Sequence, residues 1–235
     1  MYPILYEKTE RAFTSGGIAS LSSCTSCIVT EERNGVFECE FVYPITGPHY
    51  DDIQEHKFVA VTHDETGEIE PFEIYGRSAP INGLVTFFAH HVSYWLTKAV
   101  CMPFSATSCP DAIGKLKDYI ITEGSFSFWT NKMTTGNYSV KEPRGAKGVL
   151  GGEEGSLLDR YGKGDYKFRK FEVLLYTDRG EDTDVEIRYG KNLKDITYEK
   201  DTSSSYNAIV PYWVDPETGE VMTLPEGFLK YSGIN

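Results

Sequence analysis

The chain has 235 residues, of which 40% are apolar and 14% aromatic, and this content excludes a disordered protein. Its 35 acidic and 23 basic residues give a net charge of −12, which argues against a protein that grips nucleic-acid phosphates. The length accommodates one large domain or two small ones.

Targeting and redox signals are weak. The sequence has no run of 18 apolar residues, so no transmembrane helix is expected. The N-terminus lacks the basic start and apolar core of a secretory signal, which favours a protein made in the cytoplasm. The cysteines are odd in number and follow no framework spacing, so we expect free thiols made in a reducing compartment. They are Cys24, Cys27, Cys39, Cys101 and Cys109.

Two alternating runs flank Asn34-Gly35 in residues 24–43, which predicts an antiparallel hairpin because this pair tolerates the positive φ angles of tight turns. A two-residue loop would place Glu31 across from Glu38, and a four-residue loop would avoid this like-charge pair; both lengths stay open. The expected faces are Phe37, Cys39 and Phe41 on one side, Glu38 and Glu40 on the other, with Ile28 and Thr30 opposite the first set.

Further strands are expected through residue 89, at 57–62, 69–75 and 83–89. Strands at this spacing favour a small barrel or sandwich.

The middle of the chain carries helical signals. A short helix is expected at 93–100, ended by Pro103. A clearer one begins at Ser108, which can cap the first turn, with Asp111 near the positive end of the dipole. Its apolar face is Ala112, Ile113, Leu116, Tyr119 and Ile120. A strand at 125–130 and helical turns at 143–150 and 156–161, ended by Gly151 and Gly162, follow.

Strands return in the last third of the chain. They are expected at 166–168, 171–176, 185–189, 196–200, 206–214 and 221–224.

Several segments, in order, resemble a known family. They include IVTEERNGVFECEFVYPITGPHYDDI, PINGLVTFFAHHVSYWL, FSFWTNK, GVLGGEEGSLLDRYG, DVEIRYGKNLKDI and YNAIVPYWVDPETGEVMTLPE. The chain resembles the N-terminal region of the minor structural, tail-associated proteins of long-tailed phages and prophages. The resemblance implies a tail-tip baseplate hub: a homotrimer whose β-barrel domains close the tail tube and contact the distal tail and tape-measure proteins.

The expected fold class is mainly β with short helices. We expect a β-barrel hub domain at 1–90, a small mixed α/β middle domain at 91–165 and a β-rich segment at 166–235. The last segment is expected to be part of a second barrel truncated at the C-terminus, because the family region should continue beyond it.

No catalytic, cofactor or metal residue is predicted. Cys24-x-x-Cys27 lacks a second ligand pair for zinc. His90-His91 lacks HExxH spacing. The resemblance implies that this pair lies at the strand-to-helix join after the first barrel, so we read it as a structural joint. The glycine-rich run 145–156 lacks GK[ST] and is read as loop and helix stops, and Gly155-Ser156 is read as a helix start because no GxSxG is present.

Acids and aromatic residues are the remaining candidates. Adjacent acids are abundant enough in number to include a glycosidase pair, although such acids are usually solvated. They are Glu31, Glu32, Asp51, Asp52, Glu153, Glu154, Asp182 and Asp184. Trp95 and Trp129 read as core, and Tyr212-Trp213 is the best exposed candidate for stacking on a sugar.

Three functions compete. The first is a virion structural protein at the tail tip, a self-associating trimer without enzymatic activity, specific nucleic-acid binding or membrane segment. The alternatives are the N-terminal part of a tail-associated cell-wall hydrolase and a carbohydrate-binding adhesion module.

Overall fold

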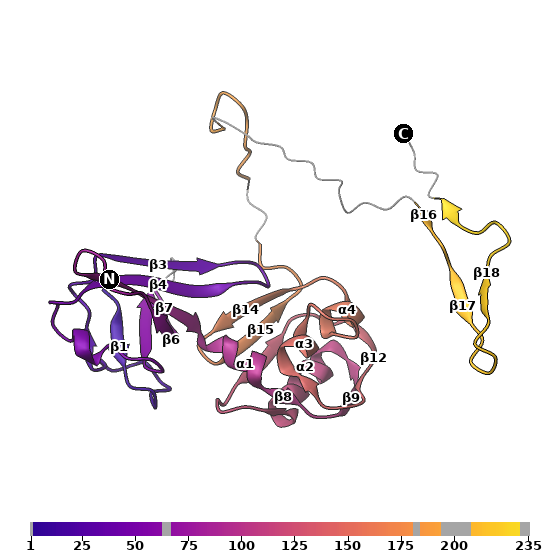
Figure 1. Ribbon diagram of the computed structural model, residues 1–235, viewed down its shortest axis with the longest axis horizontal. Coiled ribbons are helices and arrows are strands. Elements are labelled where there is room, and N and C mark those ends of the chain that lie inside the picture. Colours follow the sequence, from indigo (N-terminus) through magenta and orange to yellow (C-terminus); the bar gives the residue numbers. More distant parts are fainter. Residues whose placement is uncertain (1, 63–66, 181–183, 194–207, 231–235) are drawn as a thin grey trace. The chain divides into compact units, whose positions relative to one another are not determined.

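The computed structural model describes residues 2–62, 67–180, 184–193 and 208–230. The chain forms two compact units, unit 1 from Met1 to Glu181 and unit 2 from Asp182 to Asn235. Strands predominate and the helices are short, so the fold class is mainly β with short helices, as expected (Figure 1). The expected boundaries near residues 90 and 165 both fall inside unit 1.

The first half of unit 1 is a curled, seven-stranded antiparallel sheet with strand order β2-β1-β5-β6-β7-β4-β3 (Figure 1). Its strands are β1 Ile4–Tyr6, β2 Ala19–Ser20, β3 Ser26–Glu31, β4 Phe37–Pro44, β5 Phe58–Thr62, β6 Ile69–Arg77 and β7 Leu84–His91. A single 3₁₀ turn, η1 Tyr50–Asp52, precedes β5. The hairpins expected at 24–43 and 57–75 and the strand at 83–89 are therefore confirmed.

Strand β4 shows why this segment forms a strand. Phe37, Cys39 and Phe41 are buried on one face, whereas Glu38 and Glu40 lie on the other, which confirms the expected alternation. The register differs from both expected loop lengths. Residues 33–35 form a three-residue loop, because Glu31 pairs with Phe37 and the N–H of Glu32 donates to the carbonyl of Val36.

The second half of unit 1 surrounds small sheets with short helices. The paired strands are β10-β8-β13, β11-β15-β14 and β9-β12, and β11 runs parallel to β15. The strands are β8 Val100–Cys101, β9 Phe104–Ser108, β10 Ile120–Ile121, β11 Ser127–Thr130, β12 Thr135–Val140, β13 Arg144–Gly145, β14 Asp165–Arg169 and β15 Glu172–Tyr176. The helices are η2 Val92–Tyr94, α1 Trp95–Lys98, α2 Cys109–Tyr119, α3 Ala146–Leu150 and α4 Leu157–Tyr161.

Helix α2 follows its predicted caps. The Ser108 hydroxyl accepts a hydrogen bond from the backbone N–H of Asp111, and the Asp111 carboxylate accepts one from the N–H of Thr107. The hydrogen bond from the backbone N–H of Thr107 is the main reason that the pKa of Asp111 is lowered. Of the expected apolar face, Ala112, Ile113 and Leu116 are buried, whereas Tyr119 is partly exposed.

One apolar core extends through both halves of unit 1. It includes Leu5 of β1, Phe41 of β4, Leu116 of α2 and Leu175 of β15. A smaller cluster of Tyr6, Phe13, Phe58, Ala60 and Val92 lies beside it. The seven-stranded sheet and the helices that follow it therefore bury their apolar faces together.

Unit 2 is described in two segments. Residues 185–189 form no strand, apart from a single bridge between Tyr189 and Leu193, so the strand expected there is wrong. The strand expected at 196–200 lies outside the described residues. The pairing expected across 215–220 is confirmed, with β17 Tyr212–Val214 against β18 Val221–Thr223. A second pair joins β16 Ala208–Ile209 to β19 Leu229–Lys230.

Candidate functional site

The tip of the β3–β4 hairpin is bonded to a segment 130 residues further along the chain. The Asn34 side chain donates to the carbonyl of Gly164 and accepts from the N–H of Tyr166, at 2.9 and 2.7 Å. Arg33 contacts the buried carboxylate of Asp165. Asn34 adopts a φ of 55°, a conformation that asparagine tolerates better than most residues. The hairpin tip therefore holds the two halves of unit 1 together.

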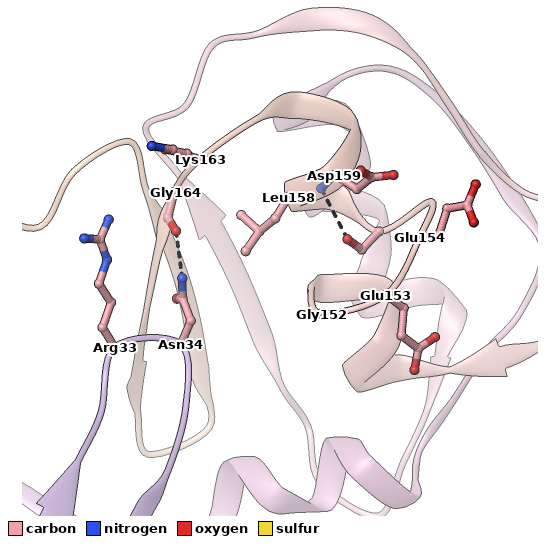
Figure 2. A pocket seen from close by; sticks show the side chains of 10 residues that line it. Arg33, Asn34, Gly152, Glu153, Glu154, Leu158, Asp159, Lys163 and Gly164 are labelled. Atoms are coloured by element: carbon pink, nitrogen blue, oxygen red, sulfur yellow. Dashed lines mark hydrogen bonds between the residues drawn. The ribbon is translucent and has the colours of Figure 1, made fainter. Parts of the chain in front are cut away.

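An open pocket of about 620 Å³ lies beside this contact (Figure 2). It is lined by Arg33, Asn34, Gly152, Glu153, Glu154, Ser156, Leu158, Asp159, Lys163 and Gly164. Figure 2 shows Arg33 and Lys163 on one wall and the carboxylates of Glu153 and Glu154 on the other. Mixed charges around an open hollow fit solvated polar contacts with a partner surface better than a dry reaction site.

Two of the carboxylates in this pocket, those of Glu153 and Asp159, already have partners. Glu153 forms an ion pair with Arg144, at 2.7 Å. Asp159 accepts from the N–H of Gly155 at 2.8 Å, and its own N–H donates to the Ser156 hydroxyl. Ser156 is thus the buried N-cap of α4, which confirms the helix start predicted at Gly155-Ser156. The glycine-rich run 145–156 contains the whole of helix α3, the loop after it and the N-cap of α4.

The histidine pair lies at the joint between β7 and η2, as expected. His91 is fully buried; its Nδ1 accepts from the N–H of Ser93. Because Nδ1 accepts, Nε2 carries the proton and donates to Glu70, at 3.2 Å. Glu70 also accepts from the backbone N–H of Lys170, at 2.6 Å. This buried carboxylate thus joins β6, the β7–η2 joint and the β14–β15 turn.

His90 points to the opposite face of β7 and lies in a stack of three rings. Its ring centroid is 3.9 Å from that of Tyr75 and 4.2 Å from that of Tyr94. Burial lowers the pKa of His90, against the opposing effect of Glu38. Burial, together with the hydrogen bond to Glu38, raises the pKa of Tyr94 to about 12. The sequence indicated His90 but not the two tyrosines that enclose it.

The cysteines and acids do not form a metal centre in the described part of the chain. No three His, Cys, Asp or Glu side chains among those residues lie close enough to hold an ion. Cys24 lies before β3 and donates from its thiol to the carbonyl of Ser26, whereas Cys27 lies within the strand.

The other acids of the sequence analysis are dispersed. Asp51 and Asp52 lie on η1, Glu31 is paired with Arg179, and Glu32 lies next to the hairpin loop. Asp184 is exposed, and Asp182 lies outside the described residues.

The tryptophans divide between core and surface. Trp95 is partly buried beside Phe58 and donates from its indole N–H to Glu73, which agrees with its assignment to the core. Trp129 is 48% exposed, so its assignment to the core is wrong. The reason is the parity of β11, where Phe128 and Thr130 face inward and Trp129 faces solvent against Tyr176.

The seven-stranded sheet has open edges. Within the described residues, β3 has a neighbour on one side only, and five of its six residues are exposed. An exposed edge strand presents backbone donors and acceptors that another strand can pair with. This edge is a candidate contact for another chain.

Unit 2 exposes apolar side chains on both faces of its hairpin. Trp213 lies across from Met222, and Val214 lies across from Val221; all four are at least 44% exposed. Tyr212, expected to be exposed with Trp213, is 69% exposed. A two-stranded hairpin in water is only marginally stable, so this surface fits burial against another element.

Helices in the described part of the chain are all too short or too polar to cross a lipid bilayer.

Comparisons with known proteins give one structural likeness to report. No family model matches the chain, and no curated protein matches it. Among solved structures, the chain is similar to the crystal structure of prophage tail protein gp18 from Listeria monocytogenes EGD-e, with a TM-score of 0.54 and 14% sequence identity. The match covers 96% of this chain and 68% of that chain. At this identity the likeness concerns the fold.

Proposed function

We propose that this chain is a structural protein of a phage or prophage tail. The observation that carries the proposal is the shared fold with a prophage tail protein over 96% of the chain. The resemblance of the ordered sequence segments points in the same direction. Fold alone does not specify function, and the exposed surfaces of the chain provide further support.

Within the tail, we assign the chain to the tip, as the baseplate hub that closes the tail tube. Two surfaces support an assembly role. The β3 edge leaves a six-residue strand open on one side, and the unit 2 hairpin exposes apolar residues on both faces. Both features are unfavourable in an isolated chain and are relieved by contact between chains. A homotrimer that also contacts the distal tail and tape-measure proteins would cover them.

The net charge of −12 is consistent with a ring through which DNA passes without specific binding. In this proposal the chain performs no reaction. The virion is its final location, after synthesis in the bacterial host cytoplasm.

The test is the assembly state of the full chain. Light scattering coupled to size-exclusion chromatography should give three times the chain mass of 26.5 kDa, and negative-stain images should show rings with a central channel. A monomer at every accessible concentration, with and without the distal tail protein, would contradict the hub. A peptidoglycan zymogram tests the absence of enzymatic activity, and a zone of clearing would overturn that part.

A further inference from the structure

Two cysteine thiols face each other across the open edge of the seven-stranded sheet. Cys27 lies on β3 and Cys39 on β4, and their sulfur atoms are 3.7 Å apart. The register pairs Cys27 with Phe41 and Cys39 with Val29, so the two cysteines are diagonal neighbours on the same face. The sequence spacing of Cys24 and Cys27 draws attention to the wrong pair, because the partner of Cys27 comes from the other strand of the hairpin.

The distance is short enough for a bond to form with a small movement. A disulfide requires about 2.05 Å between sulfur atoms, so the gap must close by about 1.7 Å. Cys27 lies on the edge strand, which has no neighbour on its outer side among the described residues. Cys27 is also exposed, whereas Cys39 is buried, so a reagent from solution reaches Cys27 first.

The environment gives the two thiols different roles. The hydrogen bond from the Cys39 thiol lowers the pKa of Cys27, which favours its thiolate at neutral pH. The same hydrogen bond, followed by burial, raises the pKa of Cys39. Once the Cys27 sulfur is in a disulfide, it no longer carries negative charge, and its contribution to the raised pKa of Cys39 is removed. Cys27 is therefore placed to attack first and Cys39 to resolve.

We propose that Cys27 and Cys39 form an intramolecular disulfide when the protein meets a small-molecule disulfide such as oxidised glutathione. The Cys27 thiolate attacks one sulfur of the oxidant, a mixed disulfide forms, and one glutathione thiolate leaves. The Cys39 sulfur then attacks Cys27, the Cys27–Cys39 bond forms, and the second glutathione leaves. The two cysteines lose two electrons and two protons, and the oxidant becomes two glutathione thiols. The inference does not depend on a role in a phage tail.

The remaining cysteines supply internal controls. Cys101 and Cys109 are buried in the second half of unit 1, and burial raises the pKa of each, that of Cys101 to about 11. Cys24 is partly buried and bonded to a backbone carbonyl, and burial raises its pKa too. Only Cys27 combines exposure with a lowered pKa.

Trypsin mapping of the intact chain tests the proposal. The protein is incubated with oxidised or reduced glutathione, blocked with an alkylating reagent under denaturing conditions and digested without reductant. Cleavage after Arg33 separates peptide 12–33, which carries Cys24 and Cys27, from peptide 34–57, which carries Cys39. The oxidised sample should contain these two peptides linked, with the intact monomer about 2 Da lighter before alkylation.

Two variants identify the cysteine involved. Cys24→Ser should still form the link, because Cys24 takes no part, whereas Cys27→Ser should lose it. The proposal is overturned by a link that requires Cys24, by a link only between different molecules, or by Cys27 that retains glutathione without reaching Cys39. Since the unaltered chain can give the last two results, the test does not depend on the folding of a variant.

Discussion

Replacement of Glu70 by leucine should destabilise unit 1 strongly. The carboxylate is 1% exposed on β6 and accepts hydrogen bonds from Nε2 of His91 and the backbone N–H of Lys170. Leucine has a comparable volume but no acceptor, so the buried donor of His91 and the partly buried donor of Lys170 would both lose this partner. Each such donor costs about 1–3 kcal/mol. The expected loss is therefore about 2–6 kcal/mol, a large part of the 5–15 kcal/mol that stabilises a typical domain.

Glu68→Leu is the matched control. Glu68 lies just before β6, its side chain is 41% exposed, and it pairs with Arg169 at 3.1 Å. An exposed ion pair contributes about 1 kcal/mol or less, so this variant should differ little from the unaltered protein. Glu70→Gln should fall between the two, because both donors reach the same oxygen of Glu70, Oε2, and a neutral amide oxygen there accepts both bonds more weakly than a carboxylate does.

Urea unfolding measures the effect. Tryptophan fluorescence should be recorded in a Trp213→Phe background, so that the remaining reporters, Trp95 and Trp129, both belong to unit 1. The midpoint should fall for Glu70→Leu while the slope with urea stays constant. If Glu70→Leu and Glu68→Leu unfold within about 0.5 kcal/mol of each other, the buried carboxylate does not hold these elements as described.

Three further predictions use matched pairs or a pH series. Tyr138→Phe should leave stability unchanged or raise it by up to about 1 kcal/mol, because the Tyr138 hydroxyl is buried without a hydrogen-bond partner, whereas Tyr166→Phe should cost about 1 kcal/mol, because its hydroxyl donates to the carbonyl of Leu150; equal thermal shifts would contradict this reasoning. Gly162→Ala should cost about 1–3 kcal/mol, because Gly162 has φ 81° and ψ −178°, whereas Gly114→Ala, at an open position inside α2, should stabilise by about 0.5–1 kcal/mol; urea midpoints that move in the same direction would refute the backbone argument. His90→Gln should remove a pH dependence: burial lowers the pKa of His90 in the folded state, so the unfolded chain takes up this proton first and the unaltered protein loses stability as pH falls below about 6.5. The stability advantage of the unaltered protein over His90→Gln should therefore shrink between about pH 8 and pH 5, and an advantage that grows on acidification would exclude this assignment.

Local signals predicted much of unit 1. The alternation of β4 places Phe37 and Phe41 inside because successive strand residues face opposite sides. Helix α2 begins where Ser108 and Asp111 predict, because capping depends on neighbours three residues apart. Features that depend on such short spacings are visible in a sequence.

Distant contacts explain the failures. The loop at Asn34 has three residues. The Asn34 side chain forms hydrogen bonds with Gly164 and Tyr166, and no local sequence pattern reveals these partners. Trp129 is exposed because it lies on the outer face of β11, and the face that packs inward is set by the neighbours of the strand, such as β15, which is more than 40 residues away. An apolar pattern at 185–189 predicted a strand, but a strand also needs a partner, and only one bridge forms there.

Among the candidate functional residues, the sequence predicts mainly those that have a structural role. Ser156 lies at the helix start that the sequence predicts, and the histidine pair lies at the strand-to-helix joint that the resemblance implies. The buried carboxylate of Glu70 and the thiol pair of Cys27 and Cys39 could not be found in this way. Both arise where separate strands bring side chains to the same place.

The bonds at the hairpin tip also bear on the order in which the protein folds. The ribosome delivers Asn34 long before Gly164, so a nascent chain can close the turn but cannot yet attach it. Until the later segment has emerged, the first sheet lacks the hydrogen bonds at the hairpin tip. Its outer strand is then open to pairing with neighbouring nascent chains. Completion of the last third of unit 1 is thus the step that locks its beginning in place.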